Sequence, residues 1–194
     1  MPTFPPETLA FLSDLQANNN KGWFDANRAR YERDYLAVGR AFHDALAARL
    51  GMPGKLMRIF RDVRFSKDKT PYKTTLDTWF TESEGWGPGV FVRLEPASLM
   101  VGMGCHQLDK DGLRKYRDAV VRDGDGLRRA LGGATLGGDV LKRPPKGYPD
   151  DPLLLHTSVH VSETGPVPED AVAHTLAVVE RFTPVYTWLR GALG

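Results

Sequence analysis

Apolar residues recur at helical spacing through the first fifty positions of the chain. Over residues 7–17 they follow the three- and four-residue steps of one helix face. A second set of this kind predicts a helix over residues 24–50, which Gly51 would end. The asparagine run 18–20 stands between the two, and asparagine both ends helices and caps them. The pattern therefore predicts an N-terminal helical hairpin.

The spacing of apolar residues changes from a helical to a strand-like pattern after residue 55. Short segments rich in β-branched and aromatic residues alternate with clusters of glycine, proline and serine, which is typical of strands joined by turns. The sequence predicts strands over residues 56–65, 74–81, 90–95, 99–104 and 156–162. Among the apolar residues expected to be buried in this sheet are Ile59 and Phe65. Because the connections are short, we expect a mostly antiparallel meander.

Helical patterns return in the C-terminal half. Asp109 is expected to cap a helix that runs to about Val121, and a short helix should cover 127–131. After a Gly- and Pro-rich loop, a further helix begins near Pro168, with Pro184 as a kink or restart. Helices, then strands, then helices predict an α+β fold: a mostly antiparallel sheet packed by the N-terminal helical hairpin and C-terminal helices. A chain of 194 residues fits a single domain, residues 1–194.

The segment RIFRDVRFSKDKTPYK, residues 58–73, sets six basic residues against two aspartates among aromatic and aliphatic side chains. Charges beside apolar residues must be paired or must face a site that uses them. In an extended conformation Asp62 would share a face with Arg58 and Arg64 and pair with one or both. Thirteen of the 26 Lys and Arg residues, but only eight of the 24 acidic residues, lie in residues 1–75. The segment is therefore the candidate functional site.

Two interpretations of this segment remain open: an anion pocket, or a structural network of ion pairs. As a pocket, it would bind its ligand through Arg61, Arg64, Lys67, Lys69, Tyr72 and Lys73. Lys146, from the basic loop KRPPKGY, would add a donor as part of a flap over the site. The candidate catalytic residues are Asp62 and Asp68, as general base or ion ligand, because carboxylates among so many cations should stay ionised.

The same motifs carry a resemblance to a known family. RIFRDVRFSKDKTPYK, preceded by NNNKGWFDANRARY and followed by LKRPPKGYPDDP, resembles a bacterial and fungal family known as domain of unknown function 2461. The residues that match its pattern are Asn18, Asn19, Trp23, Phe24, Arg61, Asp62, Arg64, Phe65, Lys67, Asp68, Lys69, Pro71, Tyr72 and Lys73. Asp151 departs from it, because the family pattern prefers a histidine before that proline. The resemblance supports a site in this segment and implies no reaction.

We predict that the protein binds an anionic, phosphate-bearing small molecule or nucleotide in a basic cleft, with hydrolytic or transfer chemistry left open. The alternative is a non-catalytic binding module for nucleic acid or a protein partner, with the charged motif partly structural. The sequence names no cofactor and no oligomeric state.

Other patterns narrow the function. His156 and His160 would lie about 13 Å apart on a strand, too far for one zinc ion, so we predict no metal site. Cys105 is the single cysteine, which excludes an intramolecular disulfide, and we expect it in the core. No apolar run approaches the roughly 18 residues of a membrane span. With no signal-peptide pattern, these features favour the cytoplasm and no membrane partner.

Overall fold

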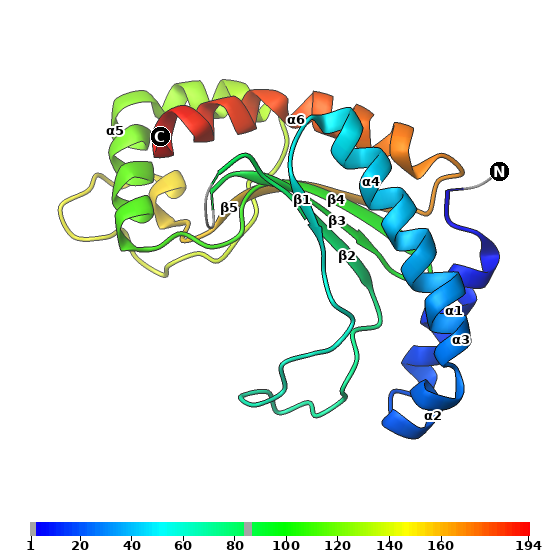
Figure 1. Ribbon diagram of the computed structural model, residues 1–194. Coiled ribbons are helices and arrows are strands. Elements are labelled where there is room, and N and C mark those ends of the chain that lie inside the picture. Colours follow the sequence, from blue (N-terminus) through cyan, green and yellow to red (C-terminus); the bar gives the residue numbers. More distant parts are fainter. Residues whose placement is uncertain (1–2, 84–86) are drawn as a thin grey trace. The chain divides into compact units, whose positions relative to one another are not determined.

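The computed structural model describes residues 3–83 and 87–194 (Figure 1). Its strands form one antiparallel sheet in which neighbours in the chain are neighbours in space, in the order β1-β2-β3-β4-β5. The strands are β1 (Gly54–Leu56), β2 (Leu76–Phe80), β3 (Gly89–Leu94), β4 (Ser98–Cys105) and β5 (Val159–Pro166). The α+β class and the antiparallel meander predicted from the sequence are confirmed.

Helices precede and follow the strands, as predicted. They are α1 (Pro6–Ala17), α2 (Lys21–Ala26), α3 (Arg28–Arg30), the π-helix η1 (Tyr31–Ala37), α4 (Val38–Leu50), α5 (Lys110–Leu131), the 3₁₀-helix η2 (Pro152–Leu155) and α6 (Ala171–Leu193). The expected cap between the N-terminal helices is present, because the Asn20 side chain accepts a hydrogen bond from the Trp23 N–H (3.0 Å). Gly51, at φ +66°, ends α4 in the left-handed conformation.

The chain divides into two compact units. The first unit comprises Met1–Phe80, Phe91–Met100 and Thr164–Leu176, and the second comprises Thr81–Val90, Val101–Glu163 and Ala177–Gly194. A single domain over residues 1–194 stays a prediction.

In the first unit, α4 packs on one face of β1 and β2. Gly39 lies against Leu76 so closely that a Cβ there would stand 2.7 Å from a Leu76 methyl carbon. The His43 ring stacks on Phe80 with 5.2 Å between centroids. Because side chains alternate along a strand, Asp77 and Trp79 of β2 point to the opposite face.

The strand predicted over residues 56–65 is wrong. β1 ends at Leu56, and residues 57–75 leave the sheet as a long loop before β2 begins (Figure 1). Within the loop, the Asp62 carboxylate accepts the Arg64 N–H (3.2 Å) and the Asp68 carboxylate accepts the Thr70 N–H (2.9 Å). Such local bonds offer the backbone turns in place of ladder pairing.

The loop also overturns the expected alternation of faces. Ile59 is buried as predicted, but Phe65 is 96% exposed. The alternating faces inferred for residues 58–65 therefore do not exist, although the predicted pairing of Asp62 with Arg64 does.

In the second unit, the predicted helices after Asp109 form one element, α5, with a kink at Asp123 (φ −149°, ψ 48°). The Asp109 side chain caps α5 by accepting the Gly112 N–H (2.8 Å), as expected. The buried Tyr116 of α5 donates from its hydroxyl to the Leu153 carbonyl of η2 (2.9 Å). β5 begins at Val159 and not at residue 156, because a 3₁₀ turn precedes it.

Candidate functional site

The base of the 57–75 loop is attached to the junction of α1 and α2. The Asn19 side chain donates to the Tyr72 carbonyl (2.9 Å) and accepts from the Tyr72 N–H (3.1 Å), as a neighbouring strand would do. The Phe24 ring stacks on the Tyr72 ring with 4.0 Å between centroids. Phe60 and Tyr72 form an isolated β-bridge across the loop. The loop therefore starts from a rigid base.

Farther out, the loop's arginines pair with its own aspartates. Arg61 is hydrogen-bonded to Asp68 and to the Thr70 hydroxyl. Arg64 binds both oxygens of Asp62, with 2.6 Å between its Nη2 and Oδ2. The side chain of Arg64 is 77% exposed, so water screens this pair and it adds little to stability. The pairing fits the interpretation that the charged motif is partly structural.

These contacts set the protonation of the two candidate catalytic aspartates. The Thr70 backbone N–H, followed by Arg61, holds the pKa of Asp68 at about 2. The Arg64 guanidinium lowers the pKa of Asp62. Both carboxylates are therefore ionised at neutral pH, as expected, and they are weak proton acceptors because general bases work best with a pKa near the operating pH.

The other predicted ligand residues occupy different surroundings. Lys67 and Lys69 are exposed on the loop, and Lys69 donates to the Val63 carbonyl (2.9 Å). The Tyr72 side chain is buried against Phe24. Lys146 is exposed in the second unit, whereas the remaining candidates belong to the first. Its role as a flap donor stays a prediction.

Lys73 instead joins a polar cluster on the sheet. Its Nζ lies 3.7 Å from Oδ2 of Asp77 in β2, whose side chain is only 5% exposed. Arg93 of β3 donates from Nε to Oδ1 (2.8 Å) and from Nη2 to Oδ2 (3.4 Å) of the same carboxylate. A buried carboxylate thus holds two cations in place on the face of the sheet opposite α4.

Aromatic side chains share this face. Trp79 of β2 and Phe91 of β3 are half-buried, with 6.4 Å between their ring centroids. The Arg93 guanidinium lies 5.2 Å from the centroid of Phe91. Lys55 of β1 pairs in register with Trp79, so its side chain belongs to the same face. We call the set Lys55, Lys73, Asp77, Trp79, Phe91 and Arg93 the sheet-face cluster.

Apart from Lys73, sequence reasoning missed the sheet-face cluster. Its signal was present, because LDTWF and GVFVRL each place a charged residue at an alternate position of an otherwise apolar strand. Charges at such positions must find partners, and Asp77 and Arg93 are partners across neighbouring strands.

The second unit carries a group of histidines. The His106 and His160 rings are 6.4 Å apart, and His156 follows η2 three residues before β5 begins. Among the described residues, no three His, Cys, Asp or Glu side chains are placed to hold a metal ion. Cys105 is buried as expected, and burial raises the pKa of its thiol to about 12.

Acid is expected to destabilise the fold through these histidines. Burial lowers the pKa of both His156 and His160, and for His160 the nearby His106 and His156 lower it further while Asp139 opposes. The unfolded chain therefore binds protons first, so stability present above about pH 6.5 is lost as the pH falls toward the lower folded-state values. Urea midpoints at pH 7.5 and 5.5 should differ less in His156→Gln/His160→Gln than in the parent. An equal shift in both proteins would contradict this assignment.

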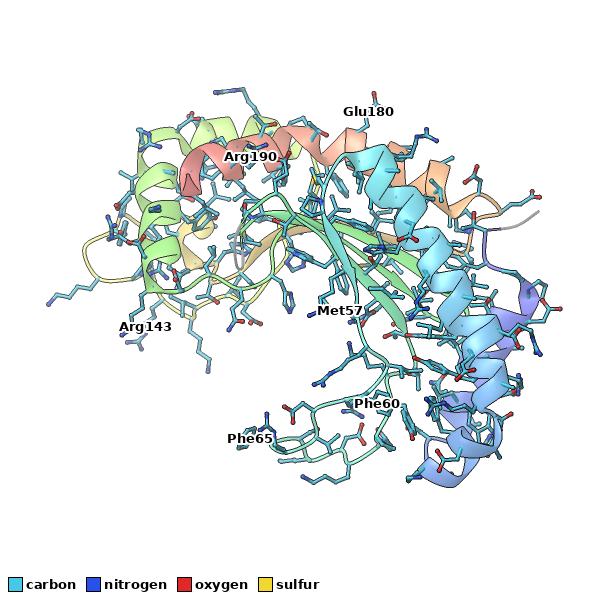
Figure 2. The ribbon with its side chains drawn as sticks, viewed as in Figure 1. Met57, Phe60, Phe65, Arg143, Glu180 and Arg190 are labelled. Carbon is cyan, nitrogen blue, oxygen red and sulfur yellow. The ribbon has the colours of Figure 1, made fainter. Side chains whose placement is uncertain are left out.

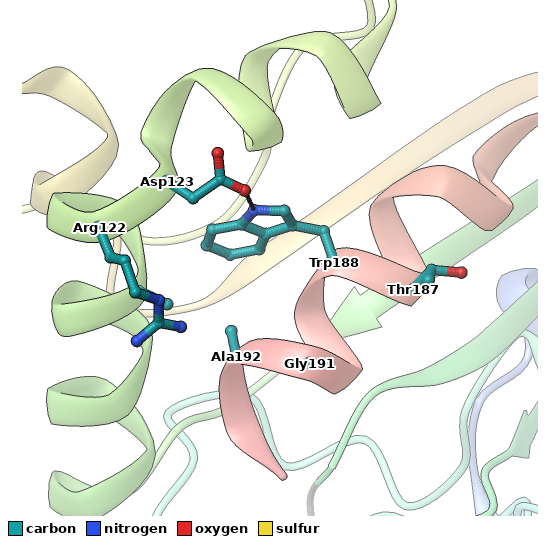
Figure 3. Close-up of a pocket in the computed structure, with 7 residues that line it drawn as sticks. Arg122, Asp123, Thr187, Trp188, Gly191 and Ala192 are labelled. Carbon is teal, nitrogen blue, oxygen red and sulfur yellow. Dashed lines mark hydrogen bonds between the residues drawn. The ribbon is translucent and has the colours of Figure 1, made fainter.

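A shallow pocket of about 240 Å³ lies between α5 and α6 in the second unit (Figure 3). Its polar centre is Asp123, which accepts from the indole N–H of Trp188 (3.2 Å) and from the Gly126 N–H (3.0 Å). The pocket contains none of the residues predicted from the sequence. Because its central carboxylate is already satisfied, the pocket offers few directed contacts to a ligand.

Comparison with known proteins settles the family. The model of the conserved hypothetical protein family DUF2461 matches residues 7–181, which include the 57–75 loop and the sheet-face cluster. The chain belongs to this family. A search of the curated proteins found no match. Within the described residues, no helix is long and apolar enough to cross a membrane.

Proposed function

We propose that this member of the DUF2461 family binds a phosphate-bearing small molecule of the nucleotide class at the sheet-face cluster. The observation that carries the proposal is the buried Asp77, which holds Lys73 and Arg93 beside two half-buried aromatic rings. Cations next to aromatic faces match the two parts of a nucleotide, its phosphate and its base.

The cations retain binding capacity. A guanidinium carries five N–H donors, so Arg93 keeps donors beyond the two that Asp77 accepts. With Lys55 and Lys73, the cluster has three cations. Two carboxylates, those of Asp77 and Glu95, lie near them and offset part of this charge. This leaves an excess of positive charge on a face that also offers ring surface, which favours an anion with an aromatic part.

The proposal assigns binding and no proton transfer to the chain. The candidate catalytic residues Asp62 and Asp68 lie on the loop, where their arginine and backbone partners keep them ionised. They would serve to fix the loop's arginines and not to exchange protons with a ligand.

Isothermal titration with AMP, adenosine and ribose 5-phosphate tests the proposal. We expect AMP to bind more tightly than either fragment, because only AMP engages both the cations and the rings. Arg93→Lys keeps the charge beside Asp77 but loses the planar fork, and we expect it to weaken AMP binding by about tenfold.

Arg128→Lys is the matched control, because Arg128 also binds both oxygens of one aspartate, Asp151, in the other unit, and its side chain is about as exposed as that of Arg93 (46% against 38%). It should leave AMP affinity unchanged. Absence of AMP binding to the parent protein, or equal weakening by the two variants, would refute the proposal.

A further inference from the structure

The two exposed phenylalanines of the described residues both lie in the 57–75 loop. Phe65 is 96% exposed and Phe60 is 46% exposed. Figure 2 shows both on the loop, with Phe65 near the end that points away from the sheet. A fully exposed phenylalanine contributes no burial energy to the fold, so its surface is available to a partner.

The two rings differ in their neighbours. Phe60 rests against the rings of Phe24 (6.0 Å) and Tyr72 (5.4 Å), so one side is fixed and the other faces out. At Phe65, the Arg64 guanidinium lies 5.8 Å from the ring centroid. The loop thus presents two separated aromatic surfaces.

Cations lie between and beside these rings. Arg61 and Arg64 are neutralised by Asp68 and Asp62. Among the described residues, no carboxylate forms an ion pair with the exposed Arg58, Lys67 or Lys69. The loop therefore carries net positive charge along its length.

The loop is also preorganised. Backbone bonds cross it from the Arg61 N–H to the Pro71 carbonyl (2.9 Å) and from the Lys73 N–H to the Ile59 carbonyl (2.7 Å). At the tip, Lys69 reaches back to the Val63 carbonyl. A braced loop loses less conformational entropy on binding than a free one.

We propose that residues 57–75 bind single-stranded nucleic acid, with bases stacked on Phe60 and Phe65 and phosphates bound by Arg58, Lys67 and Lys69. Rings at two places along one loop, with unpaired cations before and after them in the chain, offer both stacking surfaces and phosphate contacts to a strand. A duplex hides its base faces, and a membrane surface would engage only the tip. None of the five residues named here belongs to the sheet-face cluster.

Fluorescence anisotropy with labelled 20-nucleotide oligo(dT) and oligo(U) provides the test. Three contacted phosphates predict a slope of log K against log salt of about −2. Phe65→Ala should weaken binding by about fivefold or more, the effect of losing one stacked base. Val140→Ala is the matched control, because Val140 is also exposed (59%) and lies in a loop of the other unit. It should leave affinity unchanged.

Lys67→Ala/Lys69→Ala gives a second readout, because removing two cations should make the salt slope shallower by about 1.4. Melting temperatures of all variants should match the parent, since the changed side chains are exposed. No binding at low salt, or equal affinity of parent and Phe65→Ala, would overturn the proposal. So would sedimentation with phosphatidylserine vesicles in the absence of oligonucleotide binding, which would assign the tip to an anionic lipid surface.

Discussion

Replacing Phe24 by alanine is expected to lower the free energy of unfolding by about 3–5 kcal/mol. The Phe24 side chain is 1% exposed, stacks on Tyr72 and approaches Tyr31 (5.0 Å) and Phe60. Its removal leaves a cavity among the rings of η1 and the loop, which are held in place by their own backbones. Urea denaturation followed by circular dichroism measures the change.

Phe65→Ala is the control for this loss. It deletes the same side chain, but from an exposed position in the loop that Phe24 anchors. Its urea midpoint should stay within error of the parent. If the two variants are destabilised equally, the packing assigned to Phe24 is wrong.

Arg93→Met should cost about 3 kcal/mol, the lower end of the range for breaking a buried ion pair. It removes both hydrogen bonds from Arg93 to the buried Asp77 carboxylate and leaves the Lys73 ion pair, at 3.7 Å. Adding Asp77→Asn to the same chain should restore part of the loss, because a neutral amide costs less to bury than a carboxylate. The parent, the two single variants Arg93→Met and Asp77→Asn, and the double variant form a double-mutant cycle. Urea denaturation measures the stability of each of the four proteins.

Arg128→Met supplies the comparison. Its partner Asp151 is more exposed, at 22% of the side chain, so the stranded carboxylate can take up water and the loss should be smaller. An Arg93→Met protein as stable as the parent, or no recovery in the double variant, would show that Asp77 is not held by this pair.

Local features of the chain predicted much of the architecture. The spacing of apolar residues located the helical hairpin, and the asparagine at position 20 and the aspartate at 109 act as the helix caps expected of them. Three of the predicted strands, 74–81, 90–95 and 99–104, agree with β2, β3 and β4 within two residues. These features are local: helix periodicity, capping and turns depend on residues a few positions apart.

Local sequence patterns predicted only part of the candidate site. The charged segment and its Asp62–Arg64 pair were predicted, because those residues are neighbours in the chain. Its conformation was not, because the apolar alternation of residues 56–65 resembles a strand, whereas in the structure Asp62 and Asp68 form local side-chain turns in a loop.

The sequence by itself determined the α+β class, the helix caps at Asn20 and Asp109, the family and the position of the charged segment. Tertiary structure decided which charges are paired and which rings are covered. Asp77 meets Arg93 only because β2 and β3 are neighbours, and Tyr72 is buried only because Asn19 and Phe24, more than 45 residues earlier, lie against it. Phe24 and Phe65 have the same side chain, and their opposite exposure follows from contacts distant in the chain, which local pattern does not encode.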